Sequence, residues 1–298
     1  MKLAKRIIRK SSTLAGRAFS IFPFQGISRP IFIIGCGRSG TTILGTTLSK
    51  HRKITYLNEP RHLWFPCFPK TDIWSEKAAR RHGKIVLTDA DADPRQGERL
   101  RRIFKFETIR TGRPVLVEKL PVNGFRLRFI CKIFPDARFI HIYRNGLEVA
   151  RSIDKFALVV PWFGFSSYKW NQLAQHASTD EETAFLPKLC TNNYERGLLE
   201  WRLNTEAVVE FLRDLLEDSF HEISYMDLVD DPVRTMNRVM SFLDIEKDSN
   251  VTDFAGNYIA RKTKQLESSA ISEKEKLIGG KLLPLSRETP GGLTKRST

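Results

Sequence analysis

The segment GCGRSGTT at residues 35–42 brings glycines, hydroxyl groups and one arginine together in a pattern that can hold an anion. It follows a short apolar run at 30–35, which predicts a buried parallel strand, and it precedes a predicted helix at 41–51. In this context a glycine-rich turn points backbone N–H groups at a phosphate, and the helix N-terminus adds its dipole. The candidate binding residues of this loop are Gly37, Arg38, Ser39, Gly40, Thr41 and Thr42.

The loop departs from the nucleotide-kinase pattern GxxxxGK[ST] at one position that matters for chemistry. Gly35 and Gly40 keep the glycine spacing, but Thr41 stands where a kinase has the lysine that contacts the β- and γ-phosphates. The basic residue is Arg38 instead, and no second acidic strand end offers a Mg²⁺ ligand. We therefore expect a site without a metal, and a P-loop nucleotide kinase is the less favoured alternative.

A second segment, RFIHIYRNGLEVARSI at 138–153, completes a family pattern. With both segments the chain resembles the sulfotransferases that depend on 3′-phosphoadenylyl sulfate (PAPS), and among them the tyrosylprotein sulfotransferases and their bacterial relatives. In this family [K/R]-S-G-T-T follows one strand, and a later strand ends in Arg with a Ser eight residues on. The resemblance implies PAPS as the donor and PAP as the product. It also implies that Arg144 and Ser152 hold the 3′-phosphate and that Tyr225 lies near the nucleotide.

The same resemblance implies which residues carry the chemistry. Glu59, in NEPRH at 58–62, corresponds to the base that deprotonates the acceptor hydroxyl, and His62 ranks second for this role. Lys119 matches a lysine that contacts the sulfuryl group and the leaving oxygen. Arg38 offers a planar fork to the phosphosulfate. Because no metal is expected, these cations must supply the charge stabilisation that group transfer requires.

Alternating strands and helices must position these residues. Apolar runs predict strands at 30–35, 54–57, 115–121, 137–145 and 221–228, and helical spacing predicts helices at 41–51, 125–134, 146–158, 195–216 and 232–243. The expected fold is therefore an α/β, P-loop-type three-layer sandwich with a mostly parallel central sheet flanked by helices. Ligands bind at the carboxyl ends of such strands. The glycine loop, Glu59, Lys119 and Arg144 should converge there.

We expect one sulfotransferase domain over residues 29–262, preceded by a basic segment at 1–28. The polar stretch 66–113 is weakly patterned and is interpreted as an insertion or a mobile lid. The tail at 263–298 is polar and is a candidate lid over the nucleotide. No linker-like stretch divides the chain before that tail.

The chain is strongly basic, with a net charge of +15 over 298 residues. Such a charge attracts polyanions, so a polyanion-binding module is a second alternative, although no motif for specific nucleic-acid binding is visible. Residues 1–22 contain six Lys or Arg and no acidic residue. This segment fits a helix on an anionic membrane surface, an organelle transit peptide or a disordered basic tail equally well.

The expected partner is an acceptor that bears a hydroxyl group, on a glycan, a lipid or another molecule. The basic surface favours an acceptor that is anionic or associated with a membrane. Scattered cysteines and the lack of an apolar run of about 20 residues favour a cytoplasmic protein, with residues 1–22 as a peripheral membrane contact. The aromatic segment 159–170 fits an acceptor pocket and a core equally well.

Overall fold

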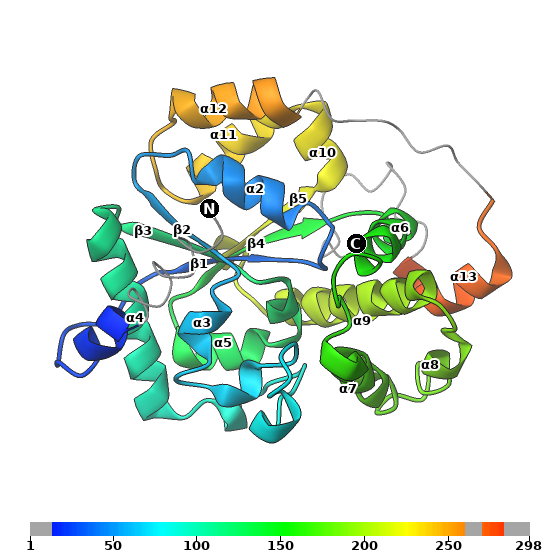
Figure 1. Ribbon diagram of the computed structural model, residues 1–298. Coiled ribbons are helices and arrows are strands. Elements are labelled where there is room, and N and C mark those ends of the chain that lie inside the picture. Colours follow the sequence, from blue (N-terminus) through cyan, green and yellow to red (C-terminus); the bar gives the residue numbers. More distant parts are fainter. Residues whose placement is uncertain (1–13, 260–269, 283–298) are drawn as a thin grey trace.

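The computed structural model describes residues 14–259 and 270–282 and places a parallel sheet at the centre of the molecule (Figure 1). Its five strands follow the order β2-β3-β1-β4-β5. They are β1 (Ile31–Ile34), β2 (Ile54–Asn58), β3 (Val115–Lys119), β4 (Arg138–Tyr143) and β5 (Phe220–Ser224). Every neighbouring pair is parallel. The inner strands are almost continuously buried, as their apolar runs predict.

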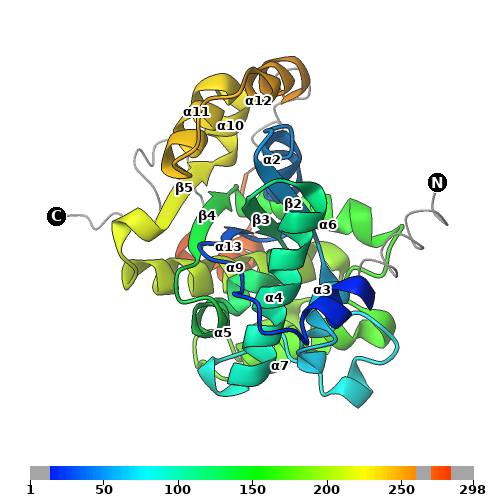
Figure 2. The ribbon, with the colours of Figure 1, turned by 90° about the vertical axis from the view of Figure 1, so that its left-hand side faces the viewer.

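Alternate residues of the strands face two separate hydrophobic cores. Ile33, Val117 and Ile140 join the core beneath α2 (Thr41–Leu48), α10 (Tyr225–Asp230), α11 (Pro232–Phe242) and α12 (Ser249–Phe254). Phe32 and Phe139 join the core on the opposite face. The sheet thus lies between two layers of helices, as Figure 2 shows in side view. This arrangement confirms the expected α/β three-layer sandwich.

Four helices cover the opposite face within the described residues. They are α4 (Pro94–Thr111), α5 (Leu127–Ile133), α6 (Gly146–Ala157) and α9 (Asn193–Arg213), with α3 (Arg61–Trp64), α7 (Tyr168–Ala177), α8 (Leu186–Leu189) and α13 (Glu273–Gly279) around them. Short 3-10 turns occupy Pro69–Thr71, Ala79–Arg81, Asp89–Asp91, Pro121–Phe125, Phe165–Ser167, Glu217–Ser219 and Gly280–Leu282, and a π-helical turn occupies Ala255–Ile259. α6, which follows β4 in the chain, packs along α9.

Helix α4 differs from the sequence-based expectation, which assigned no helix to residues 66–113. The helix begins after Asp93, whose side chain accepts a hydrogen bond from the Gln96 N–H, and Pro94 occupies its first turn. Leu100 and Phe104 are buried in the core, and the helix lies against β2 and β3. Residues 94–111 are therefore the crossover between these two strands. The interpretation of 66–113 as an insertion or a mobile lid stays a prediction.

The expected strand at 221–228 is wrong over its second half. β5 ends at Ser224, whose hydroxyl accepts a hydrogen bond from the Met226 N–H and caps α10. Tyr225 is consequently the first residue of a helix and not part of a strand. This change of direction turns the Tyr225 ring toward the glycine loop.

Candidate active site

The glycine loop, residues 35–42, connects β1 to α2. At two of its positions, Gly35 and Gly40, a side chain would collide with neighbouring atoms. Gly35 has φ +132°, and a Cβ there would lie 2.2 Å from the carbonyl oxygen of Ile142. Gly40 has φ +100°, and its Cβ would lie 2.6 Å from Cδ2 of Tyr225. The loop can therefore pack closely against β4 and α10. Thr41 then begins α2, whose N-terminus faces the same rim.

Lys119 connects this loop to the end of β2. Its ammonium group lies 2.9 Å from Thr42 Oγ1 and 2.9 Å from Glu59 Oε1, and its side chain is only 1% exposed. β2 and β3 are in register with Asn58 opposite Lys119, so the two strand ends meet. The N–H of Glu59 also donates to the carbonyl of Lys119 at 2.8 Å. One buried cation thus touches both the loop and the carboxylate.

The Glu59 carboxylate lies between two cations. Its second oxygen accepts a hydrogen bond from Arg61 at 2.8 Å. Burial acts to raise the pKa of Glu59, but the charges and hydrogen bonds of Lys119 and Arg61 outweigh it, and the pKa lies below its ordinary value. Burial lowers the pKa of Lys119, while Glu59 opposes that change. Glu59 is therefore ionised at neutral pH.

Arg38 projects from the loop toward α6. Its Nε lies 3.0 Å from Ser152 Oγ, and its guanidinium stacks over the Phe156 ring at 4.6 Å. Burial and the neighbouring Arg144 lower the pKa of Arg38, and Glu59 opposes them. Arg38 and Ser152, which lie 114 positions apart in the sequence, share one hydrogen bond.

Arg144 follows β4 and joins this group from the other side. Its Nη1 donates to the carbonyl of Arg38 at 3.3 Å, and its guanidinium lies 4.2 Å from the centre of the Tyr225 ring. Its Nε donates to Glu148 Oε2 at 2.7 Å, one turn into α6. Trp201 fixes the backbone here by donating from its indole N–H to the Arg144 carbonyl at 3.0 Å.

The structure thus brings Arg38, Arg144, Ser152 and Tyr225 together on one side of the loop, and Lys119 and Glu59 on the other. Ser39 is buried within the loop, and Gly37 lies beneath an aromatic ring. His62 lies on α3, half-buried, whereas Glu59 is the candidate base that contacts Lys119. The sequence also offers Lys262, Lys264 and Ser286 as candidates for contacting the acceptor or closing the lid, and these three lie outside the described residues.

The aromatic segment 159–170, whose composition fits a pocket wall, covers the glycine loop, a contact that the sequence did not locate. Trp162 packs over Gly37, where a Cβ would lie 2.6 Å from its ring, and its indole N–H donates to Glu200 at 2.8 Å. Lys169 donates to the other oxygen of Glu200 at 2.6 Å, with both side chains almost fully buried. Within the aromatic segment 159–170, Phe163 is buried in the hydrophobic core, whereas Trp162 packs against that core and covers the loop. The aromatic composition was visible, but the contact with Gly37 spans 125 positions.

Arg61 was also missed as a neighbour of the candidate base. Its guanidinium lies 3.7 Å from the centre of the Trp74 ring while it contacts Glu59. The residue stands two positions after Glu59, so the sequence placed the pair close together. It did not show that α3 would turn the arginine back onto the carboxylate.

Glu118 lies next to Lys119 in β3 but faces the opposite core. Its two oxygens accept hydrogen bonds from Trp64 Nε1 and Asn123 Nδ2, each at 3.1 Å. Complete burial raises the pKa of Glu118 to about 8, against the opposing effect of the Trp64 hydrogen bond and the Lys119 charge. The Glu118 carboxyl group therefore links β3 to Trp64 and Asn123 within the buried core.

The geometry agrees with a family-wide sequence pattern. The model of the sulfotransferase family matches residues 30–249, which is most of the chain and spans β1 to the start of α12. The chain belongs to the sulfotransferase family. The match includes the glycine loop, Glu59, Lys119, Arg144, Ser152 and Tyr225.

Curated relatives of this family member include protein-tyrosine sulfotransferases. The Drosophila melanogaster protein is 22% identical over 256 residues, which cover 82% of this chain and 44% of the fly protein. Protein-tyrosine sulfotransferase 1 of Mus musculus is 29% identical over 174 residues, which cover 55% of this chain and 46% of the mouse protein. The chain spans less than half the length of these relatives.

A solved structure agrees with the fold. Sulfotransferase STF1 from Mycobacterium tuberculosis H37Rv superimposes with a TM-score of 0.51 at 16% identity, over 86% of this chain and 80% of that chain. At this identity the likeness concerns the fold alone. It places the sheet and helices of this sulfotransferase-family chain in the architecture expected from the sequence.

Proposed function

We propose that this protein transfers a sulfuryl group from PAPS to an acceptor hydroxyl, with Glu59 as the general base. The observation that carries the proposal is the position of Lys119, which contacts both the glycine loop at Thr42 and the carboxylate of Glu59. A base and an anion-binding loop that share one buried cation can act on the same transferred group. Membership of the sulfotransferase family supports this reading.

The residues of the loop fit the proposed donor. Gly35 and Gly40 leave no room for side chains, so the backbone can approach a phosphate closely. Arg38 and Arg144 place two guanidinium groups beside it, and Ser152 adds a hydroxyl that contacts Arg38. In the proposal, Arg144 and Ser152 hold the 3′-phosphate, and the Tyr225 ring packs beside the nucleotide. When bound, PAPS supplies a sulfuryl group on a good leaving group.

The proposed reaction needs no metal. The acceptor oxygen forms a bond to sulfur as the bond from sulfur to the phosphate oxygen breaks, and the hydroxyl proton passes to Glu59. Arg38 and Lys119 stabilise the charge that develops on the sulfuryl oxygens and on the leaving PAP. The lowered pKa of Glu59 keeps the carboxylate ionised and able to accept the proton.

We further propose a cytoplasmic location with a peripheral membrane contact near the N-terminus. Within the described residues, Leu14, Ile21, Phe22 and Phe24 are each at least half exposed. Phe24 stacks on Phe19 at 4.8 Å, and Phe19 in turn lies 5.4 Å from the Phe106 ring of α4, which ties this apolar group to the folded domain. Exposed apolar side chains on a basic protein suit a surface of anionic lipid. No helix in the described part of the chain combines the length and hydrophobicity of a membrane span.

The substitution Glu59→Gln tests the proposed function. It should lower turnover with ³⁵S-labelled PAPS by at least about 10²-fold, because the base is lost, while PAP affinity stays close to wild type. Extracts of lipid, glycan and protein serve as acceptor sources. If Glu59→Gln retains turnover, Glu59 is not the base, and His62→Gln becomes the next variant. If PAP raises the melting temperature of neither protein but ATP with Mg²⁺ does, the donor assignment is wrong.

A further inference from the structure

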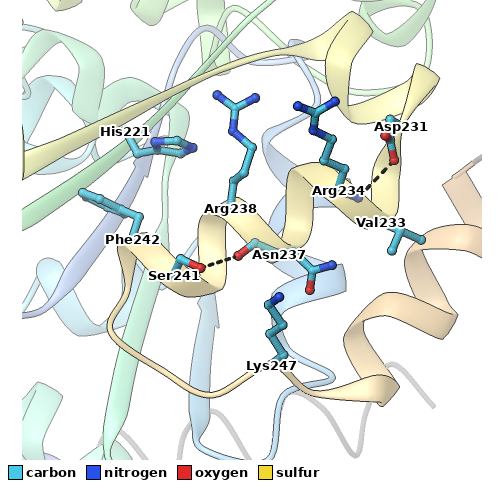
Figure 3. Close-up of a pocket in the computed structure, with 9 residues that line it drawn as sticks. All are labelled: His221, Asp231, Val233, Arg234, Asn237, Arg238, Ser241, Phe242 and Lys247. Atoms are coloured by element: carbon cyan, nitrogen blue, oxygen red, sulfur yellow. Dashed lines mark hydrogen bonds between the residues drawn. The ribbon is translucent and has the colours of Figure 1, made fainter.

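The outer face of α11 borders a basic hollow that lies apart from the candidate active site. It has a volume of about 620 Å³ and opens between α11, the first half of β5 and the loop that carries Lys247 (Figure 3). None of the residues that line it belongs to the glycine loop or contacts Lys119. Three of them are cations, Arg234, Arg238 and Lys247.

These three cations have no carboxylate partner among residues 14–259 and 270–282. The one acidic residue in the lining is Asp231, whose side chain accepts the backbone N–H of Arg234 at 3.0 Å as the cap of α11. Arg234 and Arg238 stand four positions apart on one helix, and Figure 3 shows their guanidinium groups extending side by side. Two like charges at this spacing repel each other and destabilise a helix.

Asn237 and His221 are further polar residues that line the hollow. Oδ1 of Asn237 is buried and has no hydrogen-bond partner within the described residues, so this oxygen can accept a hydrogen from a ligand. The His221 ring stacks on Phe242 at 5.4 Å and forms one wall. Burial and the charge of Arg238 lower the pKa of His221, against the effect of Glu222, so the ring adds no charge at neutral pH.

We propose that this hollow binds the phosphate or sulfate monoester group of a soluble polyol. Arg234 and Arg238 take the ester oxygens, since the arginine fork matches tetrahedral oxyanions in a bidentate manner. Lys247 adds a third positive charge from the following loop. A hydroxyl of the polyol donates to Asn237 Oδ1. The hollow is far larger than one phosphate or sulfate ion, which leaves space for the carbon skeleton.

The chain offers a matched pair of double variants for the test. Arg234→Gln/Arg238→Gln removes two charges from α11, and Arg128→Gln/Lys132→Gln removes two exposed charges at the same spacing from α5. Each protein is titrated by calorimetry with glucose 6-sulfate, glucose 6-phosphate, inorganic sulfate and vesicles that contain phosphatidylinositol phosphate. The titrations are run at low salt, with and without saturating PAP. The comparison of the two doubles does not depend on PAP binding, so its outcome is separate from that of the proposed function.

Wild type and the α5 double should bind both esters, and the α11 double should bind at least about 10-fold more weakly, because it lacks the charged donors. Added salt should weaken the binding in wild type. The α11 double should melt at the wild-type temperature or above it, because a like-charge pair is gone. Equal binding by the two doubles would overturn the site. Inorganic sulfate binding as tightly as the esters would overturn the role of the polyol. Binding only to vesicles that contain phosphatidylinositol phosphate would overturn the soluble ligand.

Discussion

Lys119 and Glu59 meet at the adjoining ends of two parallel strands, with 2.9 Å between the ammonium nitrogen and the nearer carboxylate oxygen. The pairing of Asn58 with Lys119 in the sheet sets this distance, and the hydrogen bond from the Glu59 N–H to the Lys119 carbonyl fixes the turn. The contact is therefore a property of the sheet register. Any change in the charge of one residue acts directly on the other.

The substitution Lys119→Met should abolish most of the turnover and leave nucleotide binding almost unchanged. We expect kcat to fall by at least about 10²-fold, because the buried cation that stabilises the leaving oxygen is lost. PAP affinity should stay within about threefold of wild type, since Arg144 and Ser152 remain. Single-turnover kinetics with labelled PAPS measures the first effect and calorimetry the second. A kcat close to wild type, in a variant that melts normally, would reduce Lys119 to a structural role.

The substitution Arg61→Gln should move the acid limb of the pH–rate profile. Arg61 and Lys119 together hold the pKa of Glu59 below its ordinary value against the effect of burial. Without Arg61 the pKa of Glu59 rises, so the carboxylate loses its ionised form at a higher pH. The acid limb of kcat/KM, measured from about pH 3 to pH 8 so that the range includes the lowered pKa of Glu59, should therefore shift to higher pH. The exposed Arg128→Gln is the control, and an unmoved limb in Arg61→Gln would contradict the assignment of that limb to Glu59.

The substitution Arg144→Ala should remove discrimination between PAP and AMP, which lacks the 3′-phosphate. A charged partner of a phosphate contributes roughly 1.5–3 kcal/mol, so PAP affinity should fall about 10- to 100-fold while AMP affinity changes little. Calorimetry with both nucleotides gives the ratio. Lys155→Gln, an exposed cation on the same helix as Ser152, should leave that ratio unchanged. Equal losses for PAP and AMP would place Arg144 elsewhere on the nucleotide.

The sequence was sufficient for features that rest on local patterns. The strand before the glycine loop and the helix after it follow from hydrophobic periodicity, and the parallel order follows from alternation of elements. Glu59, Lys119 and Arg144 could be placed at one rim because each occurs where a predicted strand ends. Their convergence then required only that the strands be neighbours, as the register shows.

Three features could not be predicted from the sequence: helix α4, the end of β5, and the contact of Trp162 with the glycine loop. The reasons are competing local patterns in the first two and a large sequence separation in the third. The buried face of α4 carries Glu107 and Thr108 beside Leu100 and Phe104, so its apolar periodicity was too weak to predict a helix. The alternation in residues 221–228 imitated a strand, although Ser224 and Asp227 have the spacing of a helix start. The contact of Trp162 with Gly37 joins segments with no local signal for each other.

Glu118 makes the stability of the protein depend on pH in an unusual direction. Its pKa is raised from 4.5 to about 8 in the folded protein, because it is completely buried. Between these values the unfolded chain has lost the proton that the folded chain retains, so the free energy of unfolding falls as pH rises. The slope for this one group is about 1.4 kcal/mol per pH unit, and it flattens above the folded pKa.

The substitution Glu118→Gln should remove that contribution, because an amide keeps an acceptor for Trp64 and does not titrate. Urea unfolding at pH 5, 6, 7 and 8 should therefore give a shallower decline in the free energy of unfolding than in wild type. The free energy of unfolding of the variant, relative to that of wild type, should be highest at pH 8. At that pH wild type must either ionise the buried Glu118 or keep it protonated against the solution. Glu210→Gln, an exposed carboxylate on α9, should keep the wild-type slope. If Glu118→Gln also keeps it, the carboxyl group is ionised in the folded protein, and the charge of Lys119 on the same strand must be balancing it.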